Sequence, residues 1–207
     1  MNGSIAAETQ TVLQFANAYS SMTFSIQGTK DGQPRDLTLS YSLVYATSTS
    51  YKVNFVYVNN TVTTDATMWA TKGGTVLALY ANGRNYTNGQ AVTNYLANLM
   101  APIATYYGFG AELATSSAYF HSTGSSSMTV GGNSFGVTNY TANSPNVAIP
   151  SCNGDSYYLT TYDMSVGTPS GTTFVIIPYM ELVGTETTSG GSASISYVIQ
   201  ITAFTVG

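Results

Sequence analysis

Apolar residues at every second position are the feature that most constrains the fold of this chain. Between residues 22 and 81 such runs follow one another, separated by short turns such as Lys30-Asp31-Gly32-Gln33-Pro34, Asn59-Asn60 and Asn82-Gly83. Successive side chains of a β-strand point to opposite faces, so this period predicts strands with one apolar face each. Turns this short join neighbouring antiparallel strands. The expected apolar faces are Met22, Phe24 and Ile26; Leu37, Leu39, Tyr41, Leu43 and Tyr45; Tyr51, Val53, Phe55 and Tyr57; Ala66, Met68 and Ala70; and Val76, Ala78 and Tyr80.

The alternation returns in the C-terminal part of the chain, between residues 128 and 206. A short hairpin around Gly131-Gly132-Asn133 is followed by three longer runs over residues 156–166, 172–183 and 192–206. The last two runs are apolar on both faces over part of their length, which is typical of strands covered on both sides. We therefore expect these two strands at the centre of a sheet.

Two segments show the helical period instead. Residues 5–21 place apolar side chains at helical spacing, and Ser4 is a suitable N-cap in front of them. The same period returns between residues 89 and 120, where Pro102 is expected to kink or divide the helix. The sequence thus predicts an N-terminal helix over residues 5–21 and a central helical segment over residues 89–120.

Together these patterns predict an α+β fold in a single domain that covers residues 1–207. Its main element is a curved, mainly antiparallel β-sheet of about eight to ten strands, shaped like a half-barrel or a sandwich. The strands are expected over residues 22–81 and 128–206, with the N-terminal and central helices packed on the sheet. A chain of 207 residues is long enough for one such domain with its own core.

Charged residues are scarce, and this excludes several classes of protein. Asp, Glu, Lys and Arg together make up 7% of the chain, and the net charge is −4, whereas an average soluble domain is about 25% charged. With 43% hydrophobic residues, the composition is the reverse of that of a disordered chain. The five cations are dispersed along the sequence, so we expect no nucleic-acid partner, which would need a basic stripe.

The chain carries no recognisable catalytic or metal motif. One His and one Cys cannot build a His/Cys zinc site. His121 lies in a Ser-rich stretch, and Cys152 is expected to be a small apolar residue rather than a nucleophile. Asp163 and Glu181 are acids inside apolar strands, and we expect both to face solvent rather than to form an acid–base pair. Trp69 is expected in the core, and we predict no enzyme activity, metal or cofactor.

Composition and sequons indicate where the protein resides. Asn59, Asn85 and Asn139 begin sequons in Tyr- and Thr-rich stretches, and we predict N-glycosylation of these three side chains. Neutral polar residues do not titrate in acid, whereas ion pairs are lost when carboxylates protonate. The composition resembles that of secreted and cell-surface proteins of thermoacidophilic archaea. This resemblance implies an acid-stable protein that is extracellular or at the cell surface, and no apolar run is long enough to span a membrane as a helix.

The predicted order of elements, an amphipathic helix, a meander of strands, a central apolar helix and further long strands, resembles the LolA/LppX type of lipoprotein carrier. The resemblance covers residues 5–103 best. In that family a curved sheet closes over helices and leaves an apolar cavity for acyl chains. The resemblance implies that one face of the central helix lines such a cavity, with ligand-binding side chains at Val92, Tyr95, Leu96, Leu99, Met100 and Ile103.

Two functions of different classes remain open. The 17 Tyr, 8 Phe and 7 Met supply apolar area without charge, which suits a lipid cavity and a protein interface alike. The first hypothesis is a non-enzymatic extracytoplasmic protein that binds an apolar small molecule or lipid between the curved sheet and the central helix. The second is a self-assembling structural subunit of a cell envelope, filament or virion, whose sheet edges accept a strand from a neighbour. An enzyme acting on sugars or cell-wall polymer ranks third.

Overall fold

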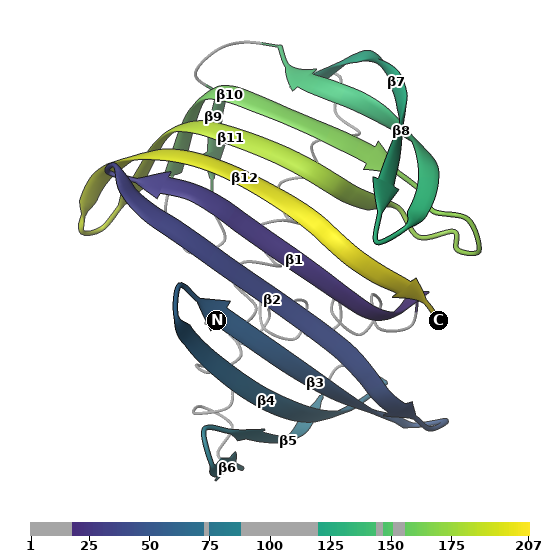
Figure 1. Ribbon diagram of the computed structural model, residues 1–207. Helices are drawn as coiled ribbons and strands as arrows, with labels where there is room; N and C mark the ends of the chain where they lie inside the picture. The colour runs from purple at the N-terminus through teal and green to yellow at the C-terminus, as the bar shows by residue number, and fades with distance from the viewer. Residues whose placement is uncertain (1–17, 73–74, 88–119, 144–146, 151–155) are drawn as a thin grey trace.

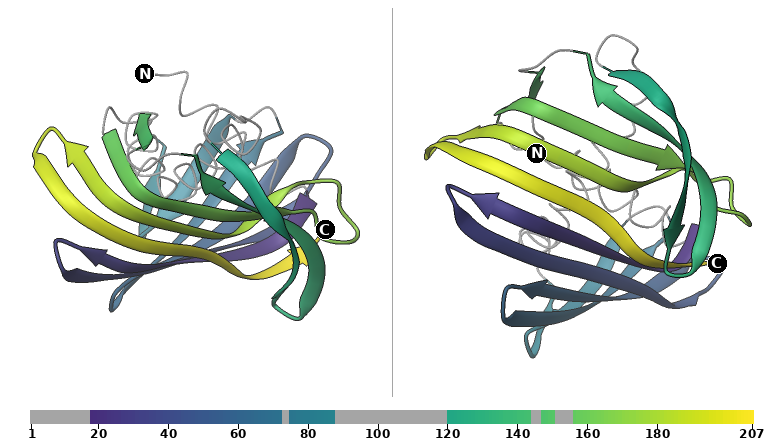
Figure 2. Two further views of the ribbon diagram at one scale, coloured as in Figure 1. Left: turned by 90° about the horizontal axis from the view of Figure 1, so that it is seen from above. Right: turned by 45° about the horizontal axis from the view of Figure 1, so that its top comes forward.

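The computed structural model describes residues 18–72, 75–87, 120–143, 147–150 and 156–207. Strands make up 81% of these residues, and none of the elements they form is a helix. The strands belong to one antiparallel sheet, which curves strongly (Figures 1 and 2). The α+β class predicted from the sequence is therefore wrong, because the described chain is all-β.

The two predicted helices are the source of this error. The helix over residues 5–21 is wrong at its C-terminal end, because β1 begins at Tyr19; residues 5–17 lie outside the described residues. The central segment over residues 89–120 also lies outside them, except for Phe120, which begins strand β7. β7 includes the Ser-rich stretch around His121, which lies outside the strands predicted over residues 22–81 and 128–206. Its side chains show no apolar period, and backbone pairing with the next strand makes it a strand.

The N-terminal half of the sheet is a meander in which each strand pairs with the next. Its turns include Asp31-Gly32 and Asn82-Gly83, whose four φ angles lie between 50° and 73°. Positive φ at both central residues is the geometry of the two-residue hairpin turn that Asn-Gly and Asp-Gly favour, so these predicted turns are confirmed. The strands are β1 (Tyr19–Lys30), β2 (Gln33–Ala46), β3 (Ser50–Asn59), β4 (Val62–Thr71), β5 (Val76–Ala81) and β6 (Arg84–Tyr86).

The C-terminal half joins this meander through β12, which pairs with β1. The order across the sheet is β6-β5-β4-β3-β2-β1-β12-β11-β10-β8-β7, and β9 pairs with β10. The described sheet thus has 12 strands, more than the eight to ten expected. The strands of this half are β7 (Phe120–Val130), β8 (Asn133–Ala142), β9 (Val147–Pro150), β10 (Ser156–Gly167), β11 (Ile176–Thr188) and β12 (Gly191–Val206).

The β7–β8 hairpin folds across the end of the sheet towards β12, as Figure 1 shows. The rings of Phe135 in β8 and Phe204 in β12 meet edge to face, with centroids 6.0 Å apart. In the turn of the hairpin, a Cβ on Gly131 would lie 3.2 Å from the Cα of Ala203. The hairpin therefore closes one end of the curved sheet.

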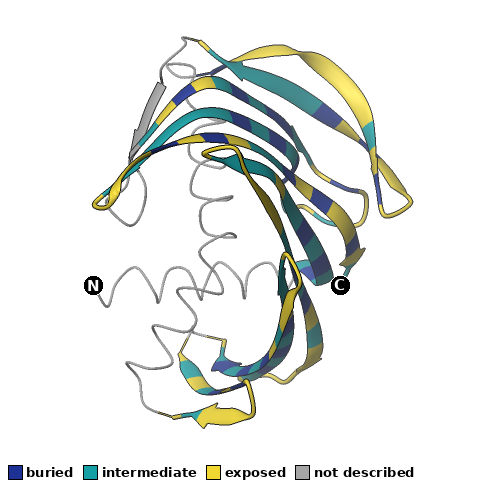
Figure 3. Ribbon diagram, turned by 60° about the vertical axis from the view of Figure 1, so that its left-hand side comes forward, coloured by how far each residue is buried: buried dark blue, intermediate teal, exposed yellow. Residues whose placement is uncertain are grey.

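One face of the sheet, here called the buried face, holds the core, and buried residues alternate with others along the strands (Figure 3). The predicted apolar faces of β1 to β4 lie on it, except for Tyr45. A register shift between Leu43 and Tyr45 turns Tyr45 to the opposite, outer face, where it is 46% exposed. The buried core residues of these four strands are Tyr19, Met22, Phe24, Leu39, Tyr41, Tyr51, Val53, Phe55, Ala66, Met68 and Ala70.

The predicted face of β5 is correct at Val76, which lies opposite the buried Ala70 and packs against the core, and wrong for Ala78 and Tyr80 beyond a register shift. Leu79 and Ala81 are fully buried, whereas Tyr80 is 49% exposed on the outer face. β5 is apolar at nearly every position, so its period does not decide which side chains point inward. Pairing with β4 decides it, because Ala81 lies opposite the buried Ala66.

The expectation that late strands are covered on both faces is confirmed for the start of β11. Ile176, Ile177 and Pro178 are buried in succession, so both faces are covered there. β11 and β12 also lie inside the sheet rather than at an edge.

Candidate functional site

The predicted ligand-binding residues Val92, Tyr95, Leu96, Leu99, Met100 and Ile103 lie outside the described residues. Their role stays a prediction. The described part of the chain offers three other candidate surfaces: the buried face, a hydrogen-bonded region of the outer face, and a pair of hollows elsewhere on the outer face.

Two tyrosines of the buried face donate their hydroxyls to backbone carbonyls. The Tyr19 hydroxyl donates to the carbonyl of Phe174 at 2.9 Å, and that of Tyr41 donates to the carbonyl of Tyr19 at 3.2 Å. Burial raises the pKa of Tyr19 to about 12 and that of Tyr41 further, because the phenolate would lose its hydration. These tyrosines therefore act as core residues with their polar ends satisfied.

Tyr162 in β10 differs from Tyr19 and Tyr41. Its side chain is 1% exposed, and its Oη is the one buried side-chain oxygen or nitrogen of the described residues without a hydrogen-bond partner. The ring packs edge to face on Phe120, with centroids 4.8 Å apart. Burial raises the pKa of this phenol far above its ordinary range. An unpaired hydroxyl in a core costs about 1–3 kcal/mol, so its presence calls for an explanation.

Tyr162 also lies at a break in the pairing of β10. β9 pairs with Ser156–Leu159 and β8 pairs with Asp163–Gly167 on the same edge of the strand. Residues 160–162 therefore pair with neither of these two strands. The unpartnered hydroxyl and the interrupted edge occur at the same position.

A charged cluster lies at the far end of the buried face, where β1 and β11 end. Lys30 Nζ lies 2.5 Å from Glu186 Oε2, and Tyr157 donates to Glu186 Oε1 at 3.2 Å. The hydrogen bond with Glu186 raises the pKa of the Lys30 ammonium. Burial, and then the Glu186 charge, raise the pKa of the nearby Tyr197. This is the one salt bridge among the described residues, and it joins the two halves of the sheet.

The outer face of the C-terminal half is crossed by side-chain hydrogen bonds. Asn139 accepts from Ser165 at 2.8 Å and donates through Nδ2 to Ser126 at 3.0 Å. Asn139 is a predicted glycosylation site, and its amide nitrogen is already engaged in the folded chain. Glycosylation at Asn139 stays a prediction; it would replace one of the two Nδ2 hydrogens and leave the other for this bond.

Asp163 and Glu181 lie directly opposite each other on β10 and β11. Both are half-buried on the outer face, where like charges in this position repel. Thr141 donates to Asp163 Oδ1, and Tyr179 donates to Glu181 Oε2 at 3.0 Å. Neighbouring hydroxyls thus hold each carboxylate, and the described residues include no group of three or more potential metal ligands.

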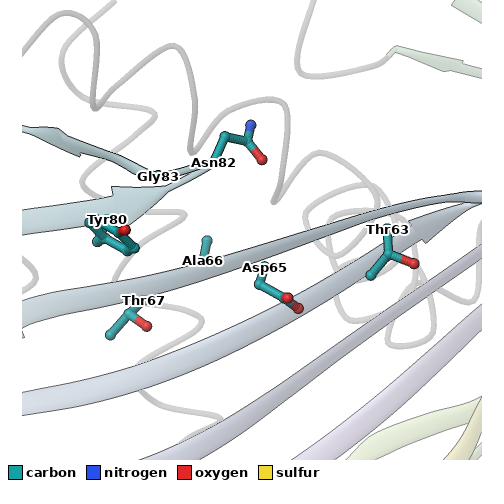
Figure 4. A pocket seen from close by; sticks show the side chains of 7 residues that line it. All are labelled: Thr63, Asp65, Ala66, Thr67, Tyr80, Asn82 and Gly83. Carbon is teal, nitrogen blue, oxygen red and sulfur yellow. The ribbon is translucent and has the colours of Figure 1, made fainter.

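Two hollows lie on the outer face of the N-terminal half, on either side of Tyr80. One, of about 480 Å³, is lined by Trp69, Leu77, Ala78, Tyr80 and Asn85. The other, of about 380 Å³, is more polar and appears in Figure 4. It is lined by Thr63, Asp65, Ala66, Thr67, Tyr80, Asn82 and Gly83.

Trp69 is not in the core, contrary to the expectation from sequence. It alternates with the buried Met68 and Ala70, so it points to the outer face, where it is half-buried. The Lys52 ammonium lies 5.3 Å from the centre of the indole, a favourable cation–π contact. A strand whose two faces are both apolar, as around Met68-Trp69, does not reveal from sequence which face is inside.

Sequence reasoning missed Tyr162, the Lys30–Glu186 pair and both hollows. The sequence does not indicate a special role for Tyr162, because tyrosines are common in apolar strands. Lys30 and Glu186 are 156 residues apart, and only the pairing of β1, β12 and β11 brings them together. His121, the single His of the chain, makes a 2.7 Å hydrogen bond with Asn143, and Cys152 lies outside the described residues.

No helix of the described chain is long and apolar enough to cross a membrane. No family model matches the sequence, and neither does any curated protein. The archaeal, acid-stable, glycosylated and cell-surface assignments therefore stay predictions.

Comparison of three-dimensional structures finds similar chains at low identity. The crystal structure of MucB matches with a TM-score of 0.42 at 14% identity, over 98% of this chain and 58% of that chain. The MucA/MucB complex of Pseudomonas aeruginosa matches with 0.41 at 11%, over 98% and 57%. A DUF1329 family protein from Desulfovibrio piger matches with 0.27 at 8%, over 97% and 91%. This chain thus spans less than two thirds of the MucB chains, and scores this low carry no conclusion about function.

Proposed function

We propose that this protein is a non-enzymatic, extracytoplasmic binding protein that holds an apolar ligand of lipid type against the buried face of its curved sheet. The observation that carries the proposal is the unpartnered hydroxyl of Tyr162. In a closed core, a buried phenol without an acceptor lowers the stability of the folded protein. Phenylalanine would fill nearly the same volume without this cost. A ligand oxygen at this position supplies the missing acceptor.

The ligand chemistry follows from the surroundings of Tyr162. Its neighbours on the buried face include Met164 and Leu182, which are buried and apolar. A neutral acceptor, such as an ester or amide carbonyl, suits this setting better than a carboxylate, because an ion would lose its hydration without a counter-charge. The proposed ligand is therefore an acyl chain that carries an uncharged carbonyl group.

The test compares Tyr162→Phe with the unchanged protein. Binding of a fluorescent fatty-acid methyl ester is measured by titration, and co-purified lipid is sought by native mass spectrometry. We expect the variant to bind the ester about two- to tenfold more weakly, because one hydrogen bond contributes about 0.5–1.5 kcal/mol. Its free energy of unfolding without ligand should stay equal or rise.

Tyr41→Phe is the matched control, because the Tyr41 hydroxyl already has a backbone acceptor. This variant should lose stability and keep its affinity for the ester. Absence of ester binding by the unchanged protein would refute the proposal. Equal affinity of the Tyr162→Phe variant would show that this hydroxyl does not contact the ligand.

A second candidate function, a self-assembling subunit, is favoured by β7. This strand pairs only with β8 among the described strands and so lies at an edge of the sheet. Over its 11 residues it contains no Asp, Glu, Lys, Arg or Pro, the residues that usually protect an edge from pairing. A strand of a second copy could therefore extend the sheet there.

Sedimentation velocity over a range of concentrations tests this second function. Ser125→Lys places a charge at an exposed position of the β7 edge strand, and we expect it to shift assemblies towards monomer. Ser196→Lys, in the interior strand β12, is the control, because Ser196 is also exposed but its strand has partners on both sides. A protein that stays monomeric at all concentrations would exclude assembly through this edge.

A further inference from the structure

The outer face of the N-terminal half carries aromatic and polar side chains in adjacent cross-strand rows. One row runs from Tyr45 through Lys52 and Trp69 to Ala78. The next runs from Asn54 through Thr67 and Tyr80 to Asn85. Trp69 and Tyr80 are diagonal neighbours in these rows, which is within reach of large side chains. The rows therefore place two aromatic rings beside each other on an open surface.

Tyr80 lines both hollows, one mainly apolar and the other mainly polar. On one side, Trp69, Leu77 and Ala78 supply apolar surface. On the other, Asp65, Thr67 and Asn82 supply a carboxylate, a hydroxyl and an amide, as Figure 4 shows. Their volumes of about 480 and 380 Å³ fall within the range of about 300–1,000 Å³ for small-molecule sites.

This arrangement matches the chemistry of a sugar ring. A pyranose has an apolar C–H face, which packs on an aromatic ring, and a rim of hydroxyls that donate to carboxylates and amides. Tyr80 is 49% exposed and Leu77 57% exposed, so the apolar surface is open to a ligand. Lys52 approaches the indole of Trp69 from β3, whereas the hollow lies towards β5.

The sequon residue Asn85 supplies an independent observation that points to carbohydrate. Its side chain lines the hollow beside Trp69 and Tyr80, and it is exposed. A glycan attached to Asn85 would therefore begin at the hollow itself. We propose that the Trp69–Tyr80 surface is a carbohydrate-binding site, filled either by the chain's own Asn85 glycan or by a free oligosaccharide.

Intrinsic fluorescence reads this site directly, because Trp69 is the only Trp in the chain. In the first arm, unglycosylated protein is titrated with neutral oligosaccharides, and the emission of Trp69 is followed. In the second arm, acrylamide quenching of Trp69 is compared between glycosylated protein and its Asn85→Gln variant. Saturable change in the first arm identifies a free sugar as ligand. Stronger quenching of the Asn85→Gln variant in the second identifies the attached glycan.

Three tyrosine variants make either result specific. Tyr80→Ala removes the ring and should lower the affinity for the oligosaccharide by about tenfold. If the attached glycan is the ligand, the same variant should raise the acrylamide quenching of Trp69 in the glycosylated protein. Tyr80→Phe keeps the ring and should retain most of the effect. Tyr158→Ala is the matched control, because Tyr158 is also 49% exposed but lies on β10, and it should change nothing.

Two results would overturn the proposal. One is the absence of a fluorescence change with oligosaccharides together with equal quenching of glycosylated protein and the Asn85→Gln variant. The other is shielding of Trp69 that depends on protein concentration and needs no carbohydrate, which would assign this surface to a protein–protein contact.

Discussion

The outer face of the sheet differs between its two halves, although one antiparallel sheet forms both. In the C-terminal half, Ser165 bonds to Asn139, and Tyr179 bonds to Glu181 across or along the strands. In the N-terminal half, Tyr80 and Leu77 leave about half of their surface in solvent beside two hollows. The C-terminal half thus has a hydrogen-bonded group of outer side chains, whereas the N-terminal half has two hollows beside an exposed tyrosine.

The difference shows where a binding site can arise on a surface with so few charges. Polar side chains that already pair with one another gain little from a ligand, because binding would first break those bonds. Exposed aromatic side chains gain from any partner that removes their apolar surface from water. The N-terminal half therefore offers the better outer-face site, even though the acids that the sequence singled out lie in the other half.

The largest expected effect concerns the junction of the two halves, where β1 meets β12. A Cβ on Gly28 would lie 1.8 Å from the Ser196 carbonyl oxygen, and its φ of +152° is one that other residues rarely adopt. We expect Gly28→Ala to lower the free energy of unfolding by about 3 kcal/mol in urea denaturation, because the two strands must separate.

Gly136→Ala is the control for this substitution. Gly136 lies in β8, and a Cβ there would have no atom within 4 Å. Its stability should change by less than about 0.5 kcal/mol. A similar small effect of Gly28→Ala would show that the junction is looser than its geometry indicates.

A smaller loss of stability is expected at alkaline pH. It tests a property that both halves share, the burial of tyrosine hydroxyls. Burial raises the pKa of Tyr19 to about 12 and raises those of Tyr41 and Tyr162 further. The folded protein keeps these phenols neutral where the unfolded chain, with values near 10, releases their protons. Their stabilising contribution is thus complete below about pH 10 and is lost as the pH rises through the raised values.

Urea denaturation between pH 8 and 12 measures this loss. Tyr41→Phe, in the N-terminal half, and Tyr162→Phe, in the C-terminal half, should each flatten the decline in the free energy of unfolding. A flattening by only one of them would show that the buried face is closed to water in one half only.

The smallest effect concerns hydrogen bonds of the outer face. Ser165→Ala removes the donor to Asn139 from a side chain that is 7% exposed, and we expect a loss of about 1–2 kcal/mol. Thr67→Val removes the comparable bond to Asn54, at 2.9 Å in the N-terminal half, and should cost about 0.5 kcal/mol because water replaces it more easily. Thermal denaturation of both variants compares the halves, and equal losses would remove the distinction between them.

Much of the N-terminal meander could be predicted from sequence. Period-two runs such as Tyr51, Val53 and Phe55 reveal the inner face, and Asp31-Gly32 and Asn82-Gly83 reveal the turns, because both signals are local. The face of β5 could not be predicted, since Leu79 and Tyr80 are both apolar enough to be buried. The predicted α+β class was wrong. It counted two segments with a helical period as helices, and it missed β7, whose side chains show no apolar period.

The candidate sites were less predictable than the fold. Tyr162 and Tyr41 are both buried, but only the Tyr41 hydroxyl has an acceptor, and no sequence pattern reports this difference. Trp69 and Tyr80 are 11 residues apart, and they become neighbours because β4 and β5 pair in one particular register.

The sequence by itself determined that the chain forms antiparallel strands with one apolar face and a surface almost free of charge, because alternation and turn residues act over a few positions. Tertiary structure alone decided that β12 joins β1, that Lys30 reaches Glu186, and that an aromatic surface stays open on one half of the outer face. The physical reason is that pairing between distant strands sets these neighbours. A shift of one residue would send every side chain of a strand to the opposite face.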